Sequence, residues 1–134
     1  MATQLKPNCS GDTGYVAAFK DLANTFAAQQ LPVQAIQLDS WWYSKASDSG
    51  LYLWEPVKCV FPDWWHLPDY DLVLHNRFFS STSPYVTSGN YTFVTDGTTA
   101  VPLDSRLFAD IMLKAKTLFN MVTYEQDWLV VSNK

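Results

Sequence analysis

Three short apolar runs, each followed directly by polar side chains, constrain this chain more than any other feature. The runs cover residues 33–38, 72–75 and 121–124. A short, mainly apolar run of this kind is typical of a strand buried on both faces, as in a parallel sheet. We therefore expect three buried strands whose carboxyl ends carry the polar residues.

Two amphipathic helices are predicted beside these strands. The first covers residues 14–30, where apolar side chains recur at helical spacing: Tyr15, Phe19, Leu22 and Phe26. The second is capped by Asp104 or Ser105 and has an apolar stripe formed by Leu107, Phe108, Ile111, Ala115 and Leu118. Strands that alternate with helices favour a parallel sheet in a single α/β domain over residues 1–134.

The remaining segments predict less regular structure. Residues 91–94 and 99–101 predict a small hairpin with an Asp96-Gly97 turn, and residues 51–54 a short extended piece. Residues 55–70 contain three prolines, which leave no room for a long helix: Pro56, Pro62 and Pro68.

Composition excludes several classes of function. The net charge is −4 and there is no basic run, so nucleic acid is not an expected partner. No apolar run reaches the roughly 18 residues of a membrane span. The two histidines and two cysteines are too scattered for a structural zinc site, so we expect no metal and no cofactor.

The cellular location stays open. Residues 1–10 are polar and lack the apolar centre of a signal peptide, whereas Asn8 and Asn90 begin glycosylation acceptor patterns. The protein is therefore either cytosolic or the secreted or lumenal product of a longer form. A disulfide between Cys9 and Cys59 is as plausible as two free thiols.

The chain is unusually aromatic. Aromatic residues make up 16% of it and include six tryptophans. Such an excess serves either a large core or a carbohydrate site, where rings stack on sugar faces. Trp41 and Trp42 directly follow the first predicted strand and its terminal Asp39, which makes all three candidates for sugar binding.

The last predicted strand ends in two acids. Because alternate side chains of a strand share a face, Glu125 and Asp127 point the same way, with Trp128 beside them. Paired carboxylates next to a tryptophan suit glycoside chemistry, and a salt-bridged surface acid is the alternative. At the middle strand, Asn76 and Arg77 are candidates for ligand contact, whereas a lone His75 more often has a packing role.

Three motifs resemble α-galactosidase-like (β/α)₈ glycoside hydrolases. Gln-Leu-Asp-Ser-Trp-Trp at residues 37–42 resembles the strand end where that family has Asp-Asp followed by Trp. Phe-Pro-Asp at residues 61–63 is similar to its Phe-Pro-x-Gly turn, and residues 122–128 resemble the strand whose Lys-x-Asp carries the nucleophile. The resemblance implies a retaining mechanism in which Asp39 binds sugar hydroxyls and Asp127 is the catalytic nucleophile.

The resemblance also implies a truncated fold. A complete barrel needs about 250 residues, so this chain would form a partial TIM-type barrel with parallel strands, roughly strands two to four. The family's acid/base would lie beyond residue 134. Ser40 replaces the family's second Asp, and Glu125 replaces its Lys.

Three functions follow as alternatives. The first is a fragment or truncated relative of a glycoside hydrolase for α-linked sugars, inactive alone. The second is a non-catalytic half-barrel domain that binds carbohydrate or a partner protein. The third is a small α/β protein whose likeness to glycosidases is accidental. A half barrel leaves open sheet edges, so self-association is also predicted.

Overall fold

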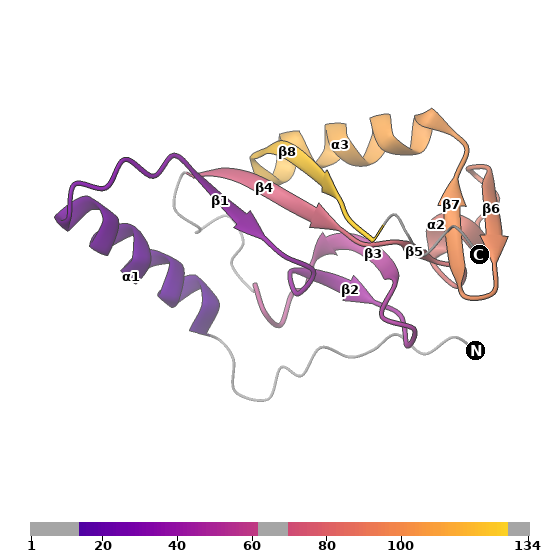
Figure 1. The fold of residues 1–134 in the computed structure, drawn as a ribbon, viewed down its shortest axis with the longest axis horizontal. Coiled ribbons are helices and arrows are strands. Elements are labelled where there is room, and N and C mark those ends of the chain that lie inside the picture. The colour runs from indigo at the N-terminus through magenta and orange to yellow at the C-terminus, as the bar shows by residue number, and fades with distance from the viewer. Residues whose placement is uncertain (1–13, 62–69, 129–134) are drawn as a thin grey trace.

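The computed structural model describes residues 14–61 and 70–128. The elements in chain order are α1 (Gly14–Ala28), β1 (Ala35–Leu38), β2 (Tyr43–Lys45), β3 (Leu51–Pro56), β4 (Asp71–Asn76), β5 (Phe79–Ser80), α2 (Pro84–Thr87), β6 (Phe93–Asp96), β7 (Thr99–Pro102), α3 (Ser105–Phe119) and β8 (Met121–Gln126). Figure 1 shows α1 beside β1 at one end of the molecule and the β6–β7 hairpin at the other.

The three predicted buried strands form one parallel sheet with the order β1-β4-β8. Leu38 of β1 pairs with Leu74 of β4, and Leu74 pairs with Tyr124 of β8. The prediction of three parallel strands is therefore confirmed, but the prediction that all three are buried is wrong: β4 is largely buried, whereas β1 and β8, the outer strands, leave most of their residues exposed or half-buried. Because all three strands run the same way, their carboxyl ends meet at one edge of the sheet, where the arrowheads gather in Figure 1.

The prediction of a partial (β/α)₈ barrel is wrong. The other strands form a separate five-stranded mixed sheet with the order β2-β3-β5-β7-β6, in which only the β3–β5 pair is parallel. A barrel would require a helix between β1 and β4. The chain instead turns back at Asp48, whose carboxylate accepts a hydrogen bond from Gly50 N (2.8 Å), and this turn closes the antiparallel β2–β3 pair.

The two long helices are confirmed, with differences at their ends. α1 ends at Ala28, and Gln30 adopts a left-handed backbone conformation (φ 54°). α3 has Asp104 as its N-cap and a left-handed Asn120 as its C-cap. Leu118 was predicted on the apolar stripe of α3, but it is 59% exposed.

The hairpin is also confirmed, one residue away from the predicted turn. Asp96 pairs with Thr99, so the loop consists of Gly97 and Thr98. Gly97 has φ 57°, a left-handed value that glycine adopts without steric cost. The predicted extended piece at residues 51–54 is the first part of β3.

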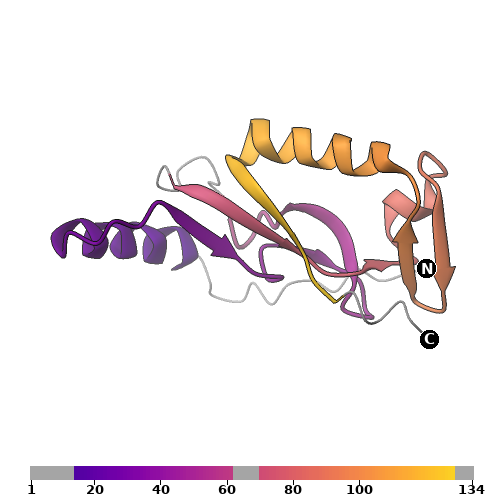
Figure 2. The same ribbon diagram turned by 45° about the horizontal axis from the view of Figure 1, so that its top comes forward.

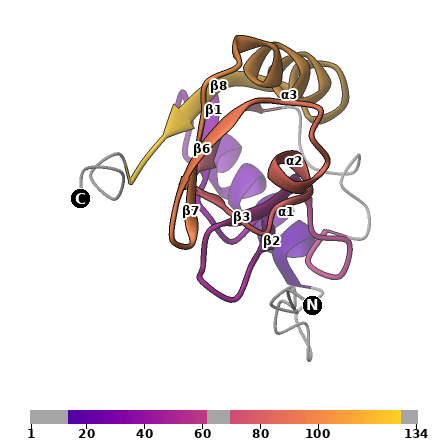
Figure 3. The same cartoon turned by 90° about the vertical axis from the view of Figure 1, so that its right-hand side faces the viewer.

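The hydrophobic core lies where the two sheets meet. α3 runs along β8 over one face of the parallel sheet (Figure 2) and buries Leu107, Ile111 and Ala115. Trp42 and Trp54 are fully buried below it, with ring centroids 5.2 Å apart. Seen from the hairpin end, α2 lies close to β3 (Figure 3).

Two further predictions fall partly outside the described residues. Cys59 is disulfide-bonded, and its predicted partner, Cys9, is not among the residues described. Within the described part of the chain, no helix is long and apolar enough to cross a membrane. β1 and β8 are the outer strands of the parallel sheet, so self-association through them stays a prediction for sedimentation analysis.

Candidate functional site

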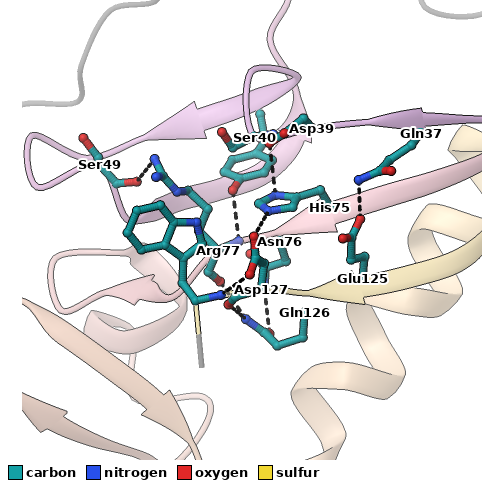
Figure 4. Close-up of polar contacts among 12 residues, drawn as sticks. Gln37, Asp39, Ser40, Ser49, His75, Asn76, Arg77, Glu125, Gln126 and Asp127 are labelled. Atoms are coloured by element: carbon teal, nitrogen blue, oxygen red, sulfur yellow. Dashed lines mark hydrogen bonds and ion pairs between the residues drawn. The ribbon is translucent and has the colours of Figure 1, made fainter. Parts of the chain in front are cut away.

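Asp39, His75 and Asp127 meet at the carboxyl edge of the parallel sheet (Figure 4). Asp39 follows β1, His75 belongs to β4, and Asp127 follows β8. His75 Nε2 lies 3.3 Å from Asp127 Oδ2, and His75 Nδ1 lies 3.8 Å from Asp39 Oδ1. Each carboxylate therefore faces a different nitrogen of one imidazole ring.

The three side chains differ sharply in exposure. The side chain of His75 is 3% exposed, whereas those of Asp39 and Asp127 are 64% and 58% exposed. The contact of His75 with Asp127 is a long hydrogen bond, whereas its 3.8 Å separation from Asp39 is too long for one. The site thus presents two anions to solvent over a buried ring.

Buried aromatic side chains fix the backbone beneath this site. Trp42 Nε1 and Trp54 Nε1 both donate to the carbonyl oxygen of His75, each at 3.1 Å. Tyr43 Oη accepts a hydrogen bond from the backbone N–H of Arg77 at 3.0 Å. Because these three residues come from β2, β3 and the residue before β2, the mixed sheet holds the end of β4 in place.

Hydrogen bonds and charge keep both carboxylates ionised. The pKa of Asp39 is lowered, first by the hydrogen bond from the backbone N–H of Ser40 and then by the charge of His75. The pKa of Asp127 is lowered by the N–H of Trp128, which donates to Oδ1 at 2.7 Å, and by the hydrogen bond with His75. At neutral pH both groups can only accept hydrogen bonds.

Trp128 and Arg77 form the outer wall of the site. The Arg77 guanidinium carbon lies 4.1 Å from the centroid of the Trp128 ring, a cation–π contact. Arg77 Nη1 also donates to Ser49 O at 3.4 Å. Trp128 is 43% exposed, so its large ring lies at the surface beside Asp127. Its backbone is left-handed, with φ 62°.

Of the other two tryptophans predicted to bind sugar, Trp42 packs in the interior and Trp41 is partly buried against the core. Trp42 is fully buried, which leaves no ring face for a ligand. Trp41 stacks on Tyr15 of α1 at 4.7 Å and on Phe61 at 5.6 Å. The prediction of ligand contact is therefore wrong for Trp42, whereas for Trp41, which is only partly buried, it stays a prediction.

Asn76 and Glu125 lie near the cluster with partners of their own. Asn76 is fully buried, and its Nδ2 donates to Tyr124 Oη at 2.6 Å, on the opposite face of the sheet from His75. Glu125 shares the His75 face and accepts a hydrogen bond from Gln37 Nε2 at 2.6 Å (Figure 4). The prediction that Glu125 and Asp127 share a face agrees with this arrangement.

The site also includes residues that sequence reasoning missed. Tyr43 and Trp54 support the end of β4, and Gln37 pairs with Glu125. Burial and the charge of Arg77 lower the pKa of Lys45, and the charge of Asp39 opposes this shift. Strand alternation could have placed Gln37, two residues before Asp39, on the same face.

The described residues contain no group of three His, Cys, Asp or Glu side chains that could hold a metal ion. No family model matches this chain, and no curated protein or solved structure shows significant similarity to it. The resemblance to α-galactosidase-like enzymes therefore stays a prediction that rests on three short motifs.

Proposed function

We propose that the cluster of Asp39, His75 and Asp127 binds carbohydrate. The observation that carries this proposal is the pair of exposed carboxylates held over a buried imidazole, with the Trp128 ring beside them. Ionised carboxylates accept hydrogen bonds from adjacent sugar hydroxyls, and an exposed indole covers an apolar sugar face. The Arg77 guanidinium lies against that indole.

The ionisation of the two carboxylates favours binding over general acid catalysis. A glycosidase acid needs a raised pKa so that it stays protonated near neutral pH. The pKa values of Asp39 and Asp127 are both lowered, so neither group is suited to protonate a leaving group. Non-catalytic carbohydrate binding is therefore the function that we propose first.

The binding proposal is tested by titrating the protein with monosaccharides and methyl glycosides, methyl α-galactoside among them, while amide chemical shifts are followed by NMR. We expect binding that weakens at least tenfold in Asp39→Asn and in Asp127→Asn. Asp96→Asn, on the β6–β7 hairpin, is the matched control and should bind like the unmodified protein. Failure of a folded protein to bind any sugar, or equal binding by all variants, would contradict the proposal.

Hydrolysis of α-linked glycosides, with Asp127 as nucleophile, is the second candidate. The ionised and exposed carboxylate of Asp127, hydrogen-bonded to His75, favours it. A nitrophenyl α-galactoside is the sensitive substrate, because nitrophenolate leaves without protonation. Release of nitrophenol that disappears in Asp127→Asn and persists in Asp96→Asn would establish this candidate, and no release above the buffer rate would remove it.

A further inference from the structure

An apolar pocket lies directly beyond Trp128. It has a volume of about 140 Å³ and is lined by Phe78, Phe79, residues 99–102 of β7, Phe108 of α3, Gln126 and Trp128. Phe79 and Ala100 are buried at its base, whereas Val101 and Trp128 are partly exposed at 38% and 43%. The pocket therefore opens at the junction of the two sheets.

The lining leaves few hydrogen-bonding groups for a ligand. Gln126 Nε2 donates to Arg77 O and to Asp127 O, each at 3.0 Å. Gln126 Oε1 accepts hydrogen bonds from Tyr124 Oη and from Asn76 Nδ2. Because the amide of Gln126 is already satisfied, the pocket offers mainly aromatic and aliphatic surface. A polar group placed there would lose its hydration without compensation.

The size and shape of the pocket suit an aromatic ring. A protein cavity of roughly 150 Å³ with an apolar lining binds benzene. Phe78 meets Trp128 with centroids 6.5 Å apart and an interplanar angle of 62°, an edge-to-face arrangement. An aromatic ring of a ligand can pack edge-to-face against Phe78 or Trp128 at a similar centroid distance.

The pocket and the carboxylate cluster adjoin at Trp128, although Gln126 lines the pocket from the sheet face opposite to His75. Its lining residues Gln126 and Trp128 flank Asp127 in the chain, and Phe78 follows Arg77. Trp128 is thus shared, since its ring contacts Arg77 near the cluster and Phe78 in the pocket. A ligand whose polar part lies on Asp127 would have to pass over Trp128 to place an apolar part in the pocket.

We propose that this pocket holds the aromatic or short alkyl group of a glycoside whose sugar is bound by Asp39 and Asp127. The inference rests on the proposed carbohydrate site for the sugar, but the pocket's preference for an apolar ring rests on its own lining. The chemical class of the ligand is accordingly an aryl or alkyl glycoside.

The test compares methyl α-galactoside, phenyl α-galactoside and toluene by NMR titration of the same protein. We expect phenyl α-galactoside to bind at least tenfold more tightly than the methyl glycoside, and toluene alone to shift the amides of β7. Val101→Phe fills the pocket and should abolish the preference for phenyl while leaving methyl glycoside affinity unchanged. Val122→Phe, at a 56% exposed position of β8, is the control and should retain the preference.

The outcomes separate the two proposals. Equal affinity for the two glycosides, or a phenyl preference that survives Val101→Phe, overturns the pocket inference and leaves the carbohydrate site intact. Toluene binding without binding of either glycoside overturns the glycoside inference while supporting an apolar-ring pocket, and the carbohydrate proposal is then decided by the other sugars of its own titration. Toluene binding that is lost in Val101→Phe would place the ring in this pocket.

Discussion

The parallel sheet and the mixed sheet have different roles: one carries the charged side chains of the site, and the other holds the backbone beneath them. The parallel sheet presents Asp39, His75 and Asp127 at its carboxyl edge. Among the described residues the mixed sheet presents no such cluster, but its Trp54 and Tyr43 hold the end of β4 by hydrogen bonds to the backbone. The strands that carry the charged side chains of the site therefore differ from the strands that hold its backbone in place. Substitutions in the mixed sheet should mainly lower the free energy of unfolding, whereas substitutions in the cluster should mainly change its pKa values and ligand binding.

The largest expected effect comes from removing support at the junction. Trp42→Ala deletes a fully buried ring and its hydrogen bond to His75 O, so we expect a loss of about 3–5 kcal/mol of unfolding free energy. Trp128→Ala, at a 43% exposed ring, should cost about 1 kcal/mol or less. Urea unfolding measures both, and equal losses would show that the division between core and site is wrong.

A second substitution tests the contact of the β2–β3 turn with β5. A Cβ atom at Gly50 would lie 2.6 Å from Phe78 Cε2 and 3.0 Å from Ser80 N. Gly50→Ala should therefore cost about 1–3 kcal/mol through overpacking. Gly97→Ala meets no atom within 4 Å and should cost about 1–2 kcal/mol, from its left-handed backbone (φ 57°) alone. A fully tolerated Gly50→Ala would show that the turn and β5 are not tightly packed.

The third test concerns the imidazole between the carboxylates. His75 lowers the pKa of Asp39 by charge and that of Asp127 by a hydrogen bond and charge. In His75→Phe, which keeps a buried ring, we expect the pKa of both carboxyls to rise, as measured by carbon-13 NMR titration. The Asp104 carboxyl, held by Arg106 far from the cluster, is an internal control within the same titration. Unchanged values for Asp39 and Asp127 would contradict the proposed arrangement.

The smallest effect is on stability at low pH. Because the pKa values of Asp39 and Asp127 are lowered in the folded protein, their stabilising contribution is complete above the ordinary value of 3.8. It is lost as the pH falls through the folded values. The double variant Asp39→Asn, Asp127→Asn should therefore lose less stability than the unmodified protein between pH 4 and pH 2. If the thermal unfolding midpoints of the two proteins fall equally between pH 4 and pH 2, this linkage is contradicted.

The sequence predicted the elements that have a strong local pattern. The apolar spacing of Tyr15 and Phe19 predicted α1, and the run before Asp39 predicted β1. It also predicted that Asp39 and Asp127 would gather at one edge, because parallel strands bring their carboxyl ends together. His75 was expected to pack rather than to contact ligand, and it lies buried between the two acids.

The sequence could not predict the mixed sheet. β5 has two residues and β2 has three, too few for any periodicity to be recognised. The parallel pairing of β3 with β5 is non-local and leaves no local signal. A run of buried parallel strands is also common to open sheets and barrels, so its pattern could not exclude the partial barrel.

By itself, then, the sequence determined three parallel strands, two long helices, a hairpin and the acids at the strand ends, because each depends on spacing within a short segment. The tertiary structure alone decided that Trp42 belongs to the core, that Trp41 packs partly buried against it, and that Trp128 lies at the surface. The physical reason is that the exposure of an aromatic ring depends on which distant segments cover it. Here the mixed sheet covers Trp42 and α1 packs against Trp41, whereas among the described residues Arg77 and Phe78 contact Trp128.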